Sequence, residues 1–167
     1  MKIKVALAGN PNVGKSVIFN HLTGLRQHVG NWPGKTIEKK EGYLTYNNIR
    51  IYVIDLPGTY SLTAYTPEEL ITRNYIIEDK PDVVVNIVDA SNLERNLYLT
   101  IHLIELGVKL VVALNKMDLA KDLGYEIDVK RLQELLRVPV VPTIATKKIG
   151  MDELIKKIVE VATVEKI

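Results

Sequence analysis

The feature that most constrains this chain is the glycine-rich segment at residues 9–16, which reads GNPNVGKS. It matches the pattern G-x-x-x-x-G-K-[ST], and it lies between an apolar run at 3–8 and a helical apolar pattern that starts at Val17. A strand, a loop and a helix in that order allow backbone N–H groups and the positive end of a helix dipole to converge on one anion. We therefore predict a phosphate-binding loop that consists of Gly9, Asn10, Pro11, Asn12, Val13, Gly14, Lys15, Ser16 and Val17.

Two side chains of this loop carry the expected chemistry. Lys15 is placed to reach the β- and γ-phosphates of a nucleotide, and the Ser16 hydroxyl is placed to ligate Mg²⁺. A glycine-rich turn without function is the alternative interpretation of the segment. The strand and the helix that flank it argue against that alternative.

Composition restricts the class of protein. The chain has 167 residues, of which 47% are hydrophobic and 25% are charged, as in one soluble globular domain. Its net charge of +2 is too small to indicate nucleic acid or an anionic membrane as a partner. The chain has no cysteine, and its three histidines are too scattered to form a metal-ligand set. No apolar run approaches the roughly 18 residues of a membrane span and no signal peptide precedes the first strand, so we expect a cytoplasmic domain.

Apolar runs of strand length alternate with amphipathic helical patterns along the chain. The runs at 83–88 and 110–114 are apolar on both faces, which is typical of central parallel strands. Asn47 and Asn48 separate two alternating runs and predict a hairpin. We expect one α/β domain over residues 1–167, with a mostly parallel six-stranded sheet, one antiparallel edge strand and helices on both faces. The predicted strands are 3–9, 37–46, 49–55, 82–89, 108–115 and 139–144, and the predicted helices are 15–23, 67–78, 93–106, 128–137 and 151–162.

A second motif, Asn115-Lys116-Met117-Asp118, follows the apolar run at 110–114. N-K-x-D at the end of such a strand is typical of a guanine-reading loop, because the Asp118 carboxylate can accept hydrogen bonds from guanine N1–H and from the exocyclic amine. Adenine presents an acceptor in place of N1–H, so the same carboxylate would face it unpaired. The stem of Lys116 can lie along the base plane. Helix capping by Asp118 is the alternative interpretation, and the position after this strand favours base recognition.

A third motif, Asp55-Leu56-Pro57-Gly58, follows the third predicted strand. Asp55 can hold Mg²⁺ directly or through water, and Gly58 allows its N–H to approach a γ-phosphate with no side chain in the way. The loop at residues 59–66 would then change its order with the bound nucleotide. Such a sequence is also common in ordinary turns, but its place after the phosphate loop favours the nucleotide interpretation.

The polar segment from Gly24 to Lys35 is predicted to be a long loop, and long loops in small domains are usually functional or disordered. We expect Thr36, at its end, to complete the Mg²⁺ shell when GTP is bound, with Gly34 and Lys35 beside the nucleotide. Trp32, the chain's one tryptophan, lies in this loop. It packs on the surface of the domain in one interpretation and gates the site in the other.

The segment after the last predicted strand is the weakest of the five signals. It reads Ala145-Thr146-Lys147, where Ser-Ala-Lys is the more usual sequence. Its order in the chain predicts that a backbone N–H of this loop contacts guanine O6.

With these five elements in this order, the chain resembles a small GTPase domain of the TRAFAC class over essentially its whole length. That resemblance implies a Ras-like P-loop GTPase fold that binds GTP and GDP and hydrolyses GTP. One run narrows it: residues 30–42 read GNWPGKTIEKKEG, similar to the N-W-P-G-V-T-V-E-K-K-E-G of the first switch in the ferrous iron transport protein B family, FeoB. Residues 55–62 and 94–97 fit the same family.

The FeoB resemblance implies a larger context for this domain. It implies a G domain on the cytoplasmic face of a prokaryotic cell membrane, where it regulates or energises a ferrous iron transporter. In the family a helical regulatory domain and a membrane domain follow, and both lie outside this chain. Because the chain has no cysteine and only dispersed histidines, we expect no iron to bind directly to it.

Thr59 determines how hydrolysis is expected to work, because Ras-like enzymes carry at this position a glutamine that orients the attacking water. Threonine is too short for that task. The resemblance implies a remedy, a K⁺ ion at the β- and γ-phosphates held by Asn12 and the carbonyls of Gly30 and Trp32. In the alternatives, Asn12 only stabilises its turn, or Lys35, where the family has valine, replaces the cation. The predicted catalytic residues are Lys15, Asn12, Thr36 and Gly58, and the predicted Mg²⁺ ligands are Ser16, Thr36 and Asp55.

Two other functions are compatible with parts of this sequence. A ribosome-assembly GTPase of the Era or Der kind shares the phosphate-loop pattern, but we would expect a basic RNA-binding domain and no N-W-P-G run. A nucleotide-gated switch module with negligible hydrolysis has the same motifs, and a single-turnover assay would distinguish it. Dinucleotide binding is excluded because G-x-G-x-x-G does not follow the first strand.

Overall fold

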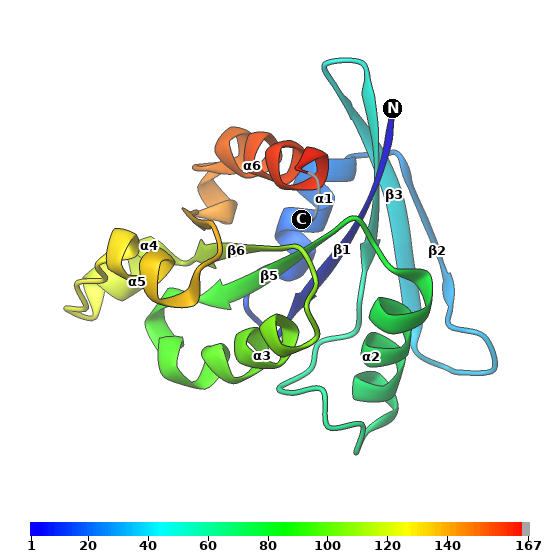
Figure 1. The fold of residues 1–167 in the computed structure, drawn as a ribbon, viewed down its shortest axis with the longest axis horizontal. Coiled ribbons are helices and arrows are strands. Elements are labelled where there is room, and N and C mark those ends of the chain that lie inside the picture. Colours follow the sequence, from blue (N-terminus) through cyan, green and yellow to red (C-terminus); the bar gives the residue numbers. More distant parts are fainter. Residues whose placement is uncertain (165–167) are drawn as a thin grey trace.

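The computed structural model describes residues 1–164, which form one mixed sheet with helices on both of its faces (Figure 1). The strands are β1 (Lys2–Gly9), β2 (Gln27–Asn31), β3 (Glu38–Tyr46), β4 (Ile49–Asp55), β5 (Val83–Asp89), β6 (Leu110–Asn115) and β7 (Val140–Pro142). The helices are α1 (Lys15–Thr23), α2 (Pro67–Asp79), α3 (Leu93–Glu105), α4 (Met117–Asp122), α5 (Val129–Leu136) and α6 (Met151–Thr163), with 3₁₀ turns η1 (Ala90–Asn92) and η2 (Ala145–Lys147).

The strand order places the carboxyl ends of β1, β4, β5 and β6 on the same side of the sheet. The order is β2-β3-β4-β1-β5-β6-β7. β1, β4, β5, β6 and β7 are parallel, and β3 is antiparallel to both of its neighbours, β2 and β4. Because parallel strands end at the same side, the segments that follow β1, β4 and β6 are brought together there.

The predicted α/β fold with a mostly parallel sheet is confirmed, but the sheet has seven strands and not six. The additional strand is β2, which lies inside the segment at 24–35 that we predicted to be a loop. β2 reads QHVGN and is exposed along most of its length, so it lacks the apolar alternation by which a strand is recognised. Backbone pairing with β3 holds it, from Gln27 opposite Gly42 to Asn31 opposite Glu38. The antiparallel edge therefore consists of two strands.

The turn between β3 and β4 confirms the predicted hairpin. Asn47 and Asn48 have φ values of 47° and 64°, and a type I′ turn requires positive φ at both central positions. Helix α4 was not predicted. It has six residues, which is too short for a helical apolar period to be seen in the sequence.

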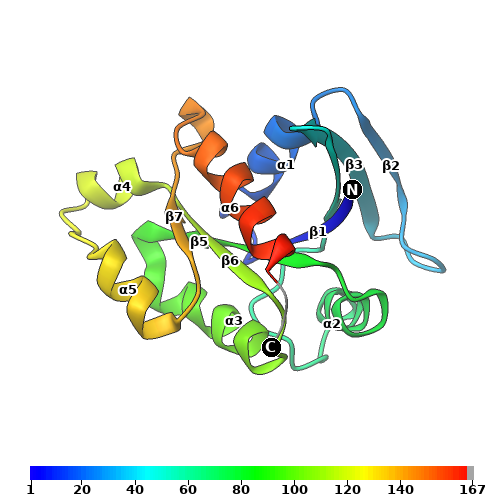
Figure 2. The same cartoon turned by 45° about the horizontal axis from the view of Figure 1, so that its top comes forward.

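Helices cover the two faces of the sheet in pairs, α1 with α6 on one face and α2 with α3 on the other (Figure 2). The core on the first face contains the fully buried Phe19 and Leu154, and the core on the second face contains Leu56 and Leu99. β5 and β6 are buried along almost their whole length, as predicted for central strands. Among residues 1–164, no helix combines the length and the apolar character that crossing a membrane requires.

Candidate functional site

The predicted phosphate loop lies at the carboxyl end of β1, where the chain turns into α1. α1 begins at Lys15, directly after Gly14, whose φ of 94° lies in the left-handed region that favours glycine. A side chain at Gly14 would collide with the carboxamide of Asn115, so this position requires glycine for space as well. No side chain caps the N-terminus of α1. Its first N–H groups are therefore available to an anion, as the motif predicted.

A cleft of about 590 Å³ brings together four segments that are far apart in the sequence. They are the phosphate loop, Gly58, the N-K-x-D motif and the loop after β7. A cleft of this size fits a small-molecule ligand. Its lining consists of Asn10, Pro11, Asn12, Gly14, Lys15, Ser16, Val17, Gly58, Asn115, Lys116, Asp118, Ile144, Ala145 and Thr146. Five other predicted site residues, Gly9, Val13, Asp55, Pro57 and Lys147, adjoin that lining in the chain or pair with one of its residues, whereas Leu56 is fully buried in the core.

An ion pair joins the phosphate-loop lysine to the D-x-x-G motif. The Lys15 ammonium contacts the Asp55 carboxylate, and the two side chains are only 11% and 9% exposed. The pair therefore places a cation for phosphate beside a carboxylate that suits Mg²⁺, with Ser16 adjoining Lys15 in the cleft lining. Carboxylate and hydroxyl oxygens are the ligands that Mg²⁺ prefers, so the residues present fit that ion.

Asn115 is the structural centre of the N-K-x-D motif. It is 3% exposed, and its Nδ2 donates to the carbonyl of Val13 at 2.9 Å. Its Oδ1 accepts hydrogen bonds from the Thr143 hydroxyl and from the Ala145 N–H, both at 3.0 Å. One buried carboxamide thus links β6, the phosphate loop and the loop after β7. Its amide group both donates and accepts hydrogen bonds, and these bonds fix the spacing between the loop at 9–16 and the N-K-x-D end of the cleft.

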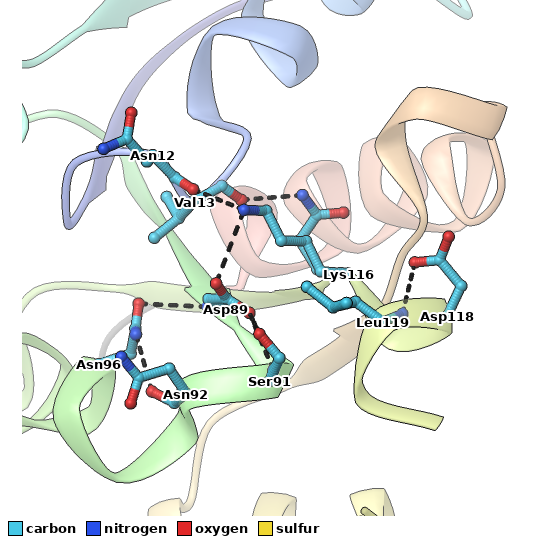
Figure 3. A network of polar contacts seen from close by, with 10 residues as sticks. Asn12, Val13, Asp89, Ser91, Asn92, Asn96, Lys116, Asp118 and Leu119 are labelled. Atoms are coloured by element: carbon cyan, nitrogen blue, oxygen red, sulfur yellow. Dashed lines mark hydrogen bonds and ion pairs between the residues drawn. The ribbon is translucent and has the colours of Figure 1, made fainter. Parts of the chain in front are cut away.

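Lys116 lies across the cleft towards the phosphate loop (Figure 3). Its Nζ donates to the carbonyl of Asn12 at 2.7 Å and lies 3.6 Å from the Asp89 carboxylate. Asp89 also accepts hydrogen bonds from Ser91, at 2.8 Å from the N–H and 2.6 Å from the hydroxyl. Sequence reasoning missed Asp89. The available signal was an acidic residue at the carboxyl end of a buried parallel strand, the position that Asp55 also has in β4.

Asp118 lies in the cleft lining and is not the N-cap of α4, a position held by Lys116. Its Oδ1 accepts a hydrogen bond from the N–H of Leu119 at 2.9 Å, and its Oδ2 lies 3.7 Å from the Lys147 ammonium. Asp118 is the second residue of α4 and accepts a hydrogen bond from a first-turn N–H, so this geometry is compatible with a role at the helix start, and base recognition stays a prediction. The carboxylate is partly exposed and lies in the cleft lining.

The segment at 24–36 is not part of the cleft lining. Gly30 pairs with Lys39 within the β2–β3 ribbon, and Gly34, Lys35 and Thr36 belong to the connection between these strands. In both views this connection lies at the far edge of the sheet, on the side of α2 (Figures 1 and 2). The assignment of Thr36 to Mg²⁺, and of Asn12, Gly30 and Trp32 to K⁺, therefore stays a prediction that requires this connection to move.

Trp32 anchors the connection to the core of the domain. It is 8% exposed, and its ring packs edge-on against Tyr75 of α2 with 5.9 Å between centroids. The ammonium of Lys39 lies 4.9 Å from the indole centroid. Burial, together with the acidic Asp79 and Glu41, raises the pKa of Tyr75 to about 12, which keeps the phenol neutral in this contact. The indole therefore packs on the domain, against α2, and a gating role for Trp32 stays a prediction.

The order of these elements defines a class of protein. A mostly parallel sheet with a phosphate loop after β1, D-x-x-G after β4 and N-K-x-D after β6 is a G domain of the P-loop GTPase class. A family model described as ferrous iron transport protein B matches residues 3–158. The chain therefore belongs to the ferrous iron transport protein B family, as the run at 30–42 indicated.

Curated relatives and solved structures agree with this assignment. The chain is 48% identical over 157 residues to the Fe(2+) transporter FeoB of Salmonella typhimurium, covering 92% of this chain and 20% of that protein. It is 55% identical to the FeoB G-domain from Methanococcus jannaschii, with 98% and 99% of the two chains covered and a TM-score of 0.88. For the cytosolic domain of T. maritima FeoB in its GMPPNP form the identity is 47%, the coverage 99% and 66%, and the TM-score 0.95. The chain spans about a fifth of the length of the curated relatives it matches.

Proposed function

We propose that this domain binds GTP and GDP with Mg²⁺ and hydrolyses GTP to GDP and phosphate. The observation that carries the proposal is the single cleft that holds a phosphate loop at one end and Asp118 at the other, with Asn115 fixing the distance between them. The T. maritima FeoB domain has solved GDP and GMPPNP forms, and this chain is 46–47% identical to them. In the proposed complex the base contacts Asp118 and the phosphates contact the loop at 9–16.

The residues of the cleft divide the work as follows. The phosphate-loop amides and Lys15 hold the phosphates, so Lys15 exchanges Asp55 for the nucleotide and leaves that carboxylate, with Ser16, to hold Mg²⁺. The metal, when bound, neutralises charge on the β- and γ-phosphates. Gly58 presents its N–H to the γ-phosphate, and Thr36 approaches when the 30–36 connection closes.

The relatives support a proposal for a broader role. We propose that the domain acts on the cytoplasmic side of the membrane as the G domain of a ferrous iron transporter, whose transport steps it regulates or energises. Support comes from relatives that are Fe(2+) transporters about five times longer than the matched region. Within residues 1–164, no three His, Asp or Glu side chains are grouped so as to hold a metal. We place iron binding in other parts of such a transporter, and no nucleic acid enters the proposal.

Calorimetry with GDP and ADP, each with Mg²⁺, tests the proposed function. We expect GDP to bind and ADP to bind at least about a hundredfold more weakly, because adenine leaves the Asp118 carboxylate unpaired. Replacing Lys15 with alanine should abolish the measured GDP binding. A wild-type domain that binds no GDP, or binds ADP as tightly, would contradict the proposal.

The cation dependence of hydrolysis is a separate prediction. We expect turnover in KCl to exceed turnover in NaCl by about tenfold or more, since a K⁺ at the phosphates would neutralise charge that develops in the transition state. Asn12→Ala should remove this difference. Asn20→Ala, an exposed asparagine of α1, is the matched control and should keep it. Equal rates in the two salts would eliminate the K⁺ site.

The rival switch module is tested by the same preparation. Thr59 is too short to orient the attacking water as glutamine does. The hydrolysis rate of Lys35→Val shows whether that lysine replaces a cation at the phosphates. A single-turnover assay with GTP decides between the two functions. A domain that converts no bound GTP even in KCl would be a binding switch and not a hydrolase.

A further inference from the structure

Two buried polar side chains beside the cleft have no hydrogen-bond partner within residues 1–164. They are the carboxamide of Asn10, with both of its polar atoms, and the hydroxyl of Thr59. Each residue is 3% exposed. An unpaired buried polar group costs about 1–3 kcal/mol, and such groups are few in folded proteins. Their presence at the cleft calls for a state of the molecule in which they are paired.

Two other buried polar side chains between the sheet and helices α2 and α3, those of Asn86 and Thr72, are paired. Asn86 donates to the carbonyl of Ala8 at 3.3 Å and accepts from the Thr100 hydroxyl at 2.5 Å. The Thr72 hydroxyl donates to the carbonyl of Pro57 at 3.4 Å. Away from the cleft, the indole Nε1 of the buried Trp32 is also without a partner within residues 1–164. At the cleft, the unpaired side chains belong to two specific segments, the phosphate loop and the start of the 59–66 segment. These are the segments expected to respond to the γ-phosphate.

The backbone already holds these two segments side by side. The N–H of Thr59 donates to the carbonyl of Gly9 at 3.0 Å. Asn10 follows Gly9 in the chain, so this bond brings the backbones of Thr59 and Asn10 close together. Gly58 lies on Pro11: a methyl group added to Gly58 would meet three Pro11 atoms at 3.2–3.3 Å. A movement of Gly58 towards a γ-phosphate therefore changes the position of Thr59 directly against Asn10.

We propose that Asn10 and Thr59 are paired positioning residues of the triphosphate state. In that state the Thr59 hydroxyl donates a hydrogen bond to the Asn10 carboxamide oxygen, and this bond holds Gly58 at the γ-phosphate. The proposal rests on the proposed function and deepens it, because it names how the site distinguishes GTP from GDP. A contact made in one of two states shifts the equilibrium towards the ligand that favours that state. GDP has no γ-phosphate and leaves the pair unmade.

Thr59→Val tests the pair, because valine keeps the shape and removes the hydroxyl. The measured quantity is the ratio of affinities for a non-hydrolysable GTP analogue and for GDP, with Mg²⁺ present. We expect the ratio to fall about tenfold, with the loss on the triphosphate side. The melting temperature should not fall, since the variant removes a hydroxyl that is unpaired in this structure. Thr59→Ser restores the hydroxyl and should restore the ratio.

Thr100→Val is the matched control, a buried threonine hydroxyl that is already paired, with Asn86. It should lower the melting temperature and keep the ratio, the opposite of Thr59→Val on both measurements. Combining Thr59→Val with Asn10→Leu should cost no more than the larger single change, because both remove one bond. An unchanged ratio in Thr59→Val, an equal effect of Thr100→Val, or additive losses in the double variant would each overturn the pair. A wild-type domain that binds neither nucleotide would overturn the proposed function, and the pair with it.

Discussion

Replacing Asp118 with asparagine should weaken GDP binding by about a hundredfold and allow xanthosine diphosphate to bind. Guanine presents two donors, N1–H and the exocyclic amine, to the carboxylate. An asparagine can accept from one of them but turns its own NH₂ towards the other. One of the two charge-assisted hydrogen bonds is then lost, the other is made to a neutral group, and two donors face each other, which together cost about 3 kcal/mol, or about a hundredfold in affinity. Xanthine has a carbonyl in place of the amine, so it accepts from that NH₂.

The geometry of Asp118 supports this expectation. The carboxylate lies in the cleft lining, and its polar contacts are with the N–H of Leu119 and with the Lys147 ammonium at 3.7 Å. An asparagine keeps the first contact through its Oδ1. The fold should therefore survive the change, and the melting temperature without nucleotide checks this point.

Asp122→Asn is the control for the same experiment. Asp122 is an exposed residue at the end of α4, four positions from Asp118 and outside the cleft lining. It carries the same loss of one negative charge, so it measures any effect of net charge alone. Titration calorimetry with both diphosphates should separate the two variants. If Asp118→Asn binds GDP within about threefold of the wild-type domain, the base lies elsewhere.

The sequence pattern is clearest where a local backbone constraint fixes the residue type. Gly14 and Gly58 are needed for conformation or close approach, and the spacing of Lys15 from Gly14 is fixed by the start of a helix. Such constraints act on neighbouring residues, so they leave a contiguous pattern in the chain. The fold class could be predicted for the same reason, because contiguous apolar runs indicate strands such as β5 and β6 that are buried on both faces.

The features that sequence analysis missed depend on partners that are distant in the sequence. β2 is held by pairing with β3 and has almost no apolar face of its own. Lys116 donates a hydrogen bond to the carbonyl of Asn12 across the cleft, and no local sequence pattern predicts this contact. The burial of Trp32 against Tyr75 likewise joins two residues that only the folded chain brings together. Tertiary contacts of this kind override local signals and cannot be read from spacing.

Replacing Trp32 with alanine should raise the preference for the GTP analogue over GDP by about tenfold. The connection at 32–37 is a closed turn, because the Trp32 N–H donates to the Ile37 carbonyl and the Lys35 N–H donates to the Trp32 carbonyl, both at 2.9 Å. Thr36 therefore moves with Trp32. Since Thr36 lies outside the cleft lining, it can reach Mg²⁺ only if the indole leaves its contact with Tyr75.

The cost of that movement sets the size of the expected effect. Burying a large side chain contributes about 1.5–3 kcal/mol, and the indole ring adds an edge-on aromatic contact and a cation above its face. That free energy opposes closure in the wild-type domain and is absent in the alanine variant. Closure is coupled to the triphosphate alone, so the change should appear in the affinity for the GTP analogue and not in that for GDP. The variant should also be less stable without nucleotide, by about 3 kcal/mol.

The wild-type domain carries its own probe of this motion, because Trp32 is its one tryptophan. Its emission should shift to longer wavelength when the GTP analogue and Mg²⁺ are added, as the indole moves into water, and should stay unchanged with GDP. Trp32→Phe is the conservative control and should lie between the wild-type domain and the alanine variant in nucleotide preference, since a phenyl ring retains part of the contact with Tyr75. If the emission spectrum does not change with the analogue and Trp32→Ala leaves the nucleotide preference unchanged, Thr36 reaches the metal while the indole of Trp32 stays packed on Tyr75. In that case the turn at 32–37 must open and the indole must stay where it is.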